Sequence, residues 1–137
     1  SAASDVYKRQ EYRDFLNEKN PVMAYNSVSA EGEIVAIAPS SGQYPVLVLI
    51  AGTTDTDGNI IEAQALDTEG NWRTFLRIRL LGNTPFAIGF PCWKVKKVRV
   101  GDTEYNVKPG DGETKTLRLV ASGSGNWEGS ILYYTEA

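Results

Sequence analysis

The sequence predicts an all-β protein: an antiparallel β-sandwich, jelly-roll-like or immunoglobulin-like, with a short N-terminal helix or arm. After residue 30 the chain consists of short runs rich in β-branched and aromatic residues, separated by Gly, Pro, Asn and Asp. No helical period long enough for a crossover helix follows, which disfavours a parallel sheet. The 137 residues, 42% of them hydrophobic, are enough for one core.

We assign residues 1–30 to the helix or arm and residues 31–137 to the sandwich domain. Residues 5–20 have the pattern of a helix, because Tyr12, Phe15 and Leu16 recur at i, i+3 and i+4 and Asn20-Pro21 ends the run. Its expected role is to pack on the domain or on a neighbouring subunit. A start at Met23 is an alternative, under which the helix would be upstream sequence.

The first ten residues, SAASDVYKRQ, resemble the translated library-adapter sequence found at the ends of some metagenomic assemblies. The resemblance covers this segment alone. It implies an uncultured-microbe or viral source, and we give residues 1–10 no functional role.

Nine strands are expected after the arm, at residues 33–38, 46–52, 60–66, 72–81, 86–90, 95–100, 103–107, 116–121 and 130–135. A local repeat supports a meander, since Asp55-Thr-Asp-Gly-Asn-Ile recurs twelve residues later as Asp67-Thr-Glu-Gly-Asn-Trp. Acid-Gly pairs suit tight hairpin turns, so the strands on either side of both turns should pair as neighbours. Gly101 marks a third such turn.

The Asp55 turn also has the oxygens of a calcium loop, but it lacks the full signature. Gly58 stands at the fourth position instead of the sixth, and Leu66 occupies the twelfth, where a bidentate Glu is needed. The sister turn at Asp67 favours the interpretation as a turn. We therefore predict no metal and no cofactor.

The absence of His and the presence of one cysteine, Cys92, exclude most side-chain catalysis at neutral pH. Ser-His-Asp and Cys-His arrangements, His-rich or four-cysteine zinc sites and an intramolecular disulfide cannot be built. Two carboxylate pairs, Asp55 with Asp57 and Asp102 with Glu104, lie in turns with no second catalytic group beside them. Cys92 is expected to be buried and inert. The longest apolar run, residues 46–51, is strand-sized, so no membrane span is expected. The sequence predicts a protein that is not an enzyme.

Charge is unevenly distributed along the chain. Between residues 73 and 100 there are seven basic residues and no acidic one, whereas the other seven basic and all 17 acidic residues lie elsewhere. Strand alternation places Arg77 and Arg79 on one outward row beside Phe75, and Lys97 and Arg99 on a similar row. These four side chains are candidates to bind an anion: a phosphate-bearing molecule, a signalling nucleotide, a nucleic acid or an acidic subunit face. The alternative is a solvated face paired with acids such as Glu62 and Glu104.

Aromatic side chains suggest a second kind of site, a flat platform for carbohydrate. Trp127 lies in a Gly/Ser loop that is expected to expose it, and Tyr133 follows nearby. Sandwich carbohydrate-binding modules are similar in general outline, although no motif is specific to them. Trp72 alternates with Leu76 and Ile78, which favours a place in the core.

Together these features predict a non-enzymatic structural or interaction protein that forms a homo-oligomer. A small acidic β domain with an arm resembles, in general character, phage virion proteins such as capsid decoration or tail components. The resemblance implies virion subunits as partners and a location in the virion or in the cytoplasm of an infected bacterium. The alternative is a small-ligand module, for carbohydrate on Trp127 and Tyr133 or for an anion on Arg77, Arg79, Lys97 and Arg99.

Overall fold

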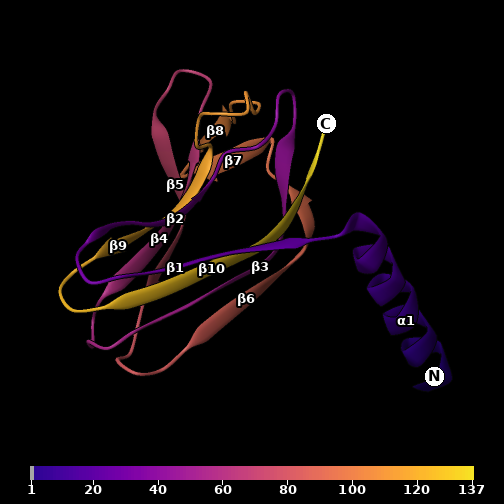
Figure 1. Ribbon diagram of the computed structural model, residues 1–137, viewed down its shortest axis with the longest axis horizontal. Coiled ribbons are helices and arrows are strands. Elements are labelled where there is room, and N and C mark those ends of the chain that lie inside the picture. Colours follow the sequence, from indigo (N-terminus) through magenta and orange to yellow (C-terminus); the bar gives the residue numbers. More distant parts are fainter. Residues whose placement is uncertain (1) are drawn as a thin grey trace.

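The computed structural model describes residues 2–137, and their side chains from Arg9 onward. Two four-stranded antiparallel sheets pack face to face (Figure 1). Sheet A has the order β1 (Val22–Val28), β10 (Trp127–Glu136), β3 (Tyr44–Thr54), β6 (Phe86–Lys94). Sheet B has the order β2 (Gly32–Ile37), β9 (Leu117–Ser122), β4 (Ile60–Leu66), β5 (Trp72–Arg79). A separate hairpin joins β7 (Lys97–Val100) to β8 (Thr103–Asn106), and α1 (Ala2–Lys19) precedes the sandwich. The predicted antiparallel sandwich with an N-terminal helix is confirmed.

The pairing order is that of a jelly roll. The first strand, β1, pairs with the last, β10, and β2 pairs with β9, the strand before the last. Consecutive strands β1 and β2 thus belong to different sheets, as in eight-stranded double-sheet jelly rolls and unlike the first two strands of an immunoglobulin domain. The structure therefore distinguishes between the two topologies that the sequence left open.

Strand β1 lies inside residues 1–30, the stretch that the sequence assigns to the helix or arm. It pairs with β10 over its full length, from Val22 opposite Tyr133 to Val28 opposite Trp127. β1 is an edge strand of sheet A, and its apolar residues Val22, Met23 and Tyr25 are largely exposed. Its sequence therefore has no clear alternation of inward apolar and outward polar residues. The sandwich thus begins at Val22, and the arm that remains is α1.

Two of the three predicted turns are hairpins. The β4–β5 turn has Gly70 at φ 89° and the β7–β8 turn has Gly101 at φ 62°, both in the left-handed region that favours glycine. The expected hairpin between β3 and β4 is wrong, because these strands lie in different sheets. The buried Asn59 holds this connection as a crossover, since its Nδ2 donates to Thr54 Oγ1 at 2.7 Å and to the carbonyl of Ser124 at 2.6 Å.

The core lies between the sheets and is built from their inward-facing side chains. Leu47, Leu119 and Ile131 are fully buried, and each contributes roughly 1.5–3 kcal/mol through removal from water. A second, smaller cluster of Val46, Val48 and Tyr134 lies on the outside of sheet A, where Leu16 of α1 covers it. Within residues 2–137, no helix is both long and apolar enough to cross a membrane.

Candidate functional site

Arg77 and Arg79 lie on the outer face of sheet B, at its edge strand β5, as predicted. Arg77 stands opposite Glu62 and Arg79 opposite Ile60 in the register with β4. Both side chains are exposed, and neither forms an ion pair with another described side chain. The predicted neighbour Phe75 is not beside them. A register shift near Ala63 and Gln64 leaves Phe75 without a partner on β4, and its ring packs edge-on against Trp93 at 5.3 Å.

Lys97 and Arg99 lie on the β7–β8 hairpin and share one acidic partner. Glu104 lies 3.7 Å from the Lys97 ammonium and 3.9 Å from the Arg99 guanidinium. All three side chains are well exposed, so these contacts contribute little to stability. The four basic candidates therefore occupy two different sheets, and Lys97 and Arg99 adopt the paired, solvated alternative with Glu104.

Arg73, in the same basic segment, is neutralised by an acid of the turn that precedes β5. Arg73 Nε donates to Asp67 Oδ2 at 2.8 Å, and the Arg73 guanidinium lies 3.9 Å from the centroid of the Tyr105 ring. Hydrogen bonds from the Asn71 backbone N–H and from Arg73 hold the pKa of the buried Asp67 below its usual range. Sequence reasoning missed this site because an Asp in an Asp-Thr-Glu-Gly turn has the appearance of a backbone feature.

The structure contradicts the expected exposure of Trp127. Its side chain is 1% exposed and belongs to the core between the sheets. The Gly/Ser loop before it does not leave it free, because Asn126 donates from its backbone and its side chain to Asp55 at 2.9 and 2.7 Å. Tyr133 is half-buried and packs against the same core, so Trp127 and Tyr133 do not form an exposed platform.

Trp72, expected in the core, is half-buried on the outer face of sheet B instead. The guanidinium carbon of Arg118 lies 4.0 Å from its ring centroid, and Arg118 Nε also donates to Gln64 Oε1 at 2.8 Å. Gln64 in turn donates to Thr74 Oγ1 at 2.9 Å. These polar partners satisfy one another, which is typical of a solvated sheet face.

The Asp55 carboxylate joins the β3–β4 connection to the loop before β10 by hydrogen bonds. Besides the two bonds from Asn126, it accepts the Thr56 hydroxyl at 2.9 Å, and these hydrogen bonds, the Asn126 backbone bond first, lower its pKa. Asp57 accepts the backbone N–H of Gly82 at 2.6 Å. No group of three or more His, Cys, Asp or Glu residues in the part of the chain that the structure describes could hold a metal ion. These contacts support the interpretation as a turn.

The feature that sequence reasoning missed is the contrast between the two outer sheet faces. The outer face of sheet B carries five charged side chains, Glu33, Glu62, Arg77, Arg79 and Arg118. The outer face of sheet A carries three charged side chains: the paired Lys94 and Glu136 beside Tyr134 at the α1 end, and Glu128 toward the other end. The rest of this outer face, together with Glu128, is called face A below; Glu128 is its one charged side chain, and it is otherwise apolar or small and uncharged. In register, face A comprises Met23, Leu132, Leu49 and Gly89 in one row, Tyr25, Ser130, Ala51 and Ala87 in the next, and Ser27, Glu128 and Thr53 in a third.

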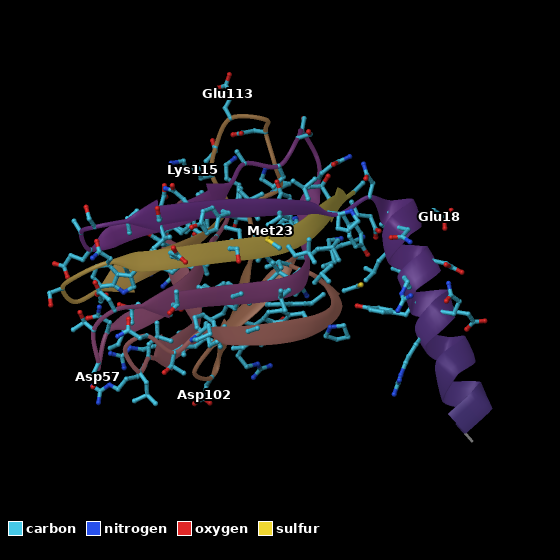
Figure 2. The ribbon with its side chains drawn as sticks, turned by 60° about the horizontal axis from the view of Figure 1, so that its bottom comes forward. Glu18, Met23, Asp57, Asp102, Glu113 and Lys115 are labelled. Atoms are coloured by element: carbon cyan, nitrogen blue, oxygen red, sulfur yellow. The ribbon has the colours of Figure 1, made fainter. Side chains whose placement is uncertain are left out.

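Face A exposes large apolar side chains to solvent. Met23 is 50% exposed and Tyr25 is 58% exposed. Figure 2 shows Met23 on the sheet, over β10. A shallow hollow of about 190 Å³ lies beside Tyr25 and is also lined by Ala51, Thr53 and Glu128. The contrast could not be read from alternation alone, because small residues such as Ala51, Ala87 and Ser130 give no strong signal in sequence.

Helix α1 sits at one end of face A. Leu16 packs on the outer cluster of sheet A, the Phe15 and Tyr134 rings meet edge-on at 6.5 Å, and Lys19 lies 3.7 Å from Glu136. Cys92, which the sequence predicts to be buried, is half-buried beneath the helix, where the Tyr12 hydroxyl lies 3.7 Å from its Sγ. These contacts come from the second half of α1, and both figures show its first turns extending away from the sandwich.

No family model and no curated protein matches the sequence. Among solved structures, the fold is similar to a protein of infectious bursal disease virus Gx strain (TM-score 0.40, 15% identity, 84% of this chain and 32% of that one). It is also similar to the C-terminal family 22 carbohydrate binding module of Clostridium thermocellum Xyn10B (TM-score 0.40, 9% identity, 82% and 85%). A third is the SPBc2 prophage-derived protein YomS (TM-score 0.34, 11% identity, 82% and 94%). The chain thus spans about a third of the viral protein, and these distant likenesses concern the fold alone.

Proposed function

We propose that the protein is a non-enzymatic structural subunit that assembles with further copies of itself through face A. The observation that carries this proposal is the charge contrast between face A and the outer face of sheet B. Outward residues of a sandwich are ordinarily polar, as they are on sheet B. A face with a single charge and half-exposed Met23 and Tyr25 has the composition of an interface core, in which Met and aromatic residues are enriched and charges depleted.

A second copy fits face A better than a charged partner does. The chain carries a net charge of −3, so two copies repel one another unless they meet through surfaces with little charge. Face A is such a surface, and it is broad and regular because it spans four paired strands. A flat patch of this kind can contact its own copy around a two-fold axis.

The proposal is tested by a matched pair of substitutions. Ser130 on β10 and Ser122 on β9 are both half-buried and both lie on central strands, Ser130 on face A and Ser122 on the outer face of sheet B. Ser130→Glu should abolish the oligomer measured by light scattering, since it buries a second negative charge beside Glu128 on the same face. Ser122→Glu should leave the mass unchanged. Equal effects of the two substitutions, or none from either, would contradict the proposed use of face A.

The proposal extends to a place in a phage particle, in the virion or in the infected bacterium. It is supported by the size, acidity, all-β fold and N-terminal arm of the chain, the features that resemble virion decoration and tail components. A particle component should build rings, tubes or sheets at high protein concentration, visible by electron microscopy. A dimer that never grows further would keep the contact through face A but contradict the role in a particle.

A second candidate function is anion binding on β5, favoured by the exposed and unpaired Arg77 and Arg79. Arg77→Ala with Arg79→Ala should weaken binding to an immobilised polyphosphate, and added salt should do the same. Lys97→Ala with Arg99→Ala is the matched control, because Glu104 lies within 4 Å of both side chains and offsets one of their two charges. Equal losses in both double variants would indicate a nonspecific charge effect.

A further inference from the structure

Glu128 is an anomaly within face A. It is exposed, stands in register between Ser27 and Thr53, and forms no ion pair with any side chain of residues 9–137. Hollows surround it, because the one beside Tyr25 is joined by two more, of about 180 and 370 Å³, lined by Asn126 and Glu128 at the adjacent loops. A lone carboxylate with open space around it, on an otherwise uncharged face, indicates a cationic partner in the assembled state.

Face A alone is too small for a stable dimer. Its four strands lie about 4.8 Å apart and contribute about six residues each at about 3.3 Å per residue, which gives roughly 400 Å². A stable interface buries about 800 Å² on each partner. A second element must therefore supply about half of the contact, and α1 extends from the end of this same face.

The two ends of face A complement each other. Glu128 lies near the start of β10, whereas Tyr134, on which α1 packs, lies near its end. Six residues of strand separate them by about 20 Å. A two-fold axis that lies in the plane of the face and crosses the strands at their midpoint would carry α1 of one copy to the Glu128 end of the other, and would keep the two Glu128 carboxylates apart.

Helix α1 carries a suitable cation. Arg13 is exposed and forms no ion pair among the described side chains, while its neighbour Asp14 is engaged by Gln10 at 2.9 Å. Tyr12, 45% exposed, stands next to it as an apolar contact. Both belong to the part of the helix beyond the adapter-like residues.

Building on the proposed function, we propose that two copies pack face A to face A around a two-fold axis, with Arg13 of each copy paired to Glu128 of the other. The helix of each subunit then completes the interface of its partner and covers the hollows around Glu128. Two equivalent ion pairs form in every dimer, because the contact is isologous.

Charge reversal tests the pairing in the full chain. Arg13→Glu or Glu128→Arg alone should raise the dimer Kd about tenfold, because each replaces two attractions with two repulsions. The two substitutions together should restore the Kd to within about threefold of the original. Glu18→Arg is the control on α1 and should leave the Kd within about twofold. If the dimer forms but neither reversal changes its Kd, the proposed pairing is wrong while the use of face A stands; if no dimer forms, both fall.

Cross-linking gives an independent measurement of the same geometry. In a Cys92→Ser background, Arg13→Cys together with Glu128→Cys should yield covalent dimers on mild oxidation, because within one chain these positions lie at opposite ends of face A. Arg99→Cys with Glu128→Cys is the control and should stay monomeric. Cross-linking that is equally efficient in both variants would overturn the arrangement.

Discussion

Replacement of Leu16 by Ala should release α1 from sheet A without unfolding the sandwich. Leu16 is the half-buried residue of the helix that packs on the cluster of Val46, Val48 and Tyr134. Truncation of a fully buried Leu to Ala costs about 2–5 kcal/mol of stability. Truncation of the half-buried Leu16 should therefore destabilise the docked helix by about 1–2 kcal/mol. That loss corresponds to a roughly 5- to 30-fold larger undocked population.

The equilibrium between docked and undocked α1 can be measured at Cys92, because it is the single cysteine and lies beneath α1, 3.7 Å from the Tyr12 hydroxyl. Its reaction rate with a thiol reagent should rise by a similar factor in Leu16→Ala. Glu18→Ala is the control, since the exposed Glu18 lies on the same helix (Figure 2) and its removal should leave the rate unchanged. An unchanged rate in Leu16→Ala, with the fold intact by circular dichroism, would refute the view that Leu16 anchors the helix.

Three further predictions concern stability. Trp127→Ala should lower the free energy of unfolding by about 3–5 kcal/mol in a urea titration, because the side chain is in the core; a change near zero would show that it is exposed after all. Asp67 has a folded-state pKa below its ordinary value, because it accepts hydrogen bonds from the Asn71 N–H and from Arg73. Its contribution to the free energy of unfolding is therefore present at pH values above the ordinary pKa and is lost as the pH falls through the lower folded pKa. Melting curves in acid should show this dependence, and Asp67→Asn should diminish it; a parallel pH profile in the variant would exclude Asp67 as its source. Burial, with Cys92 adding to it, raises the pKa of Tyr134 from 10.0 to about 12, so the folded state should lose about 3 kcal/mol as the pH rises through this window, and Tyr134→Phe should remove the loss. A tyrosine titration in which Tyr134 ionises at its ordinary pKa would contradict this.

The sequence predicted what depends on local patterns. Strand-forming runs and acid-Gly turns gave the sandwich and the two hairpins, because Gly70 and Gly101 have the positive φ that those turns require. The crossover from β3 to β4 contains the sequence Asp-Thr-Asp-Gly, which is also typical of a hairpin turn. What distinguishes it is Asn59, whose partner Ser124 is 65 residues away, and such contacts leave no local signal.

For the candidate sites, too, local patterns were predicted correctly and contacts between distant parts of the chain were missed. The alternation that places Arg77 and Arg79 outward is local and was predicted correctly, whereas Glu136, the partner of Lys94, comes from the C-terminal end of the chain. Trp127 was misplaced because its flexible-looking loop is held by Asp55, 71 residues away. Face A emerges only when β1, β10, β3 and β6, from both ends and the middle of the chain, are paired.

The most direct test of the central claim, that face A is a contact between copies, is the mass of the full chain in solution by light scattering, at about 0.1 M and about 1 M NaCl. We expect a dimer or larger species at both salt concentrations, because face A, with Glu128 as its one charge, supplies about half of the buried surface. A chain that stays monomeric, with a mass of 15.0 kDa at high protein concentration, would contradict it.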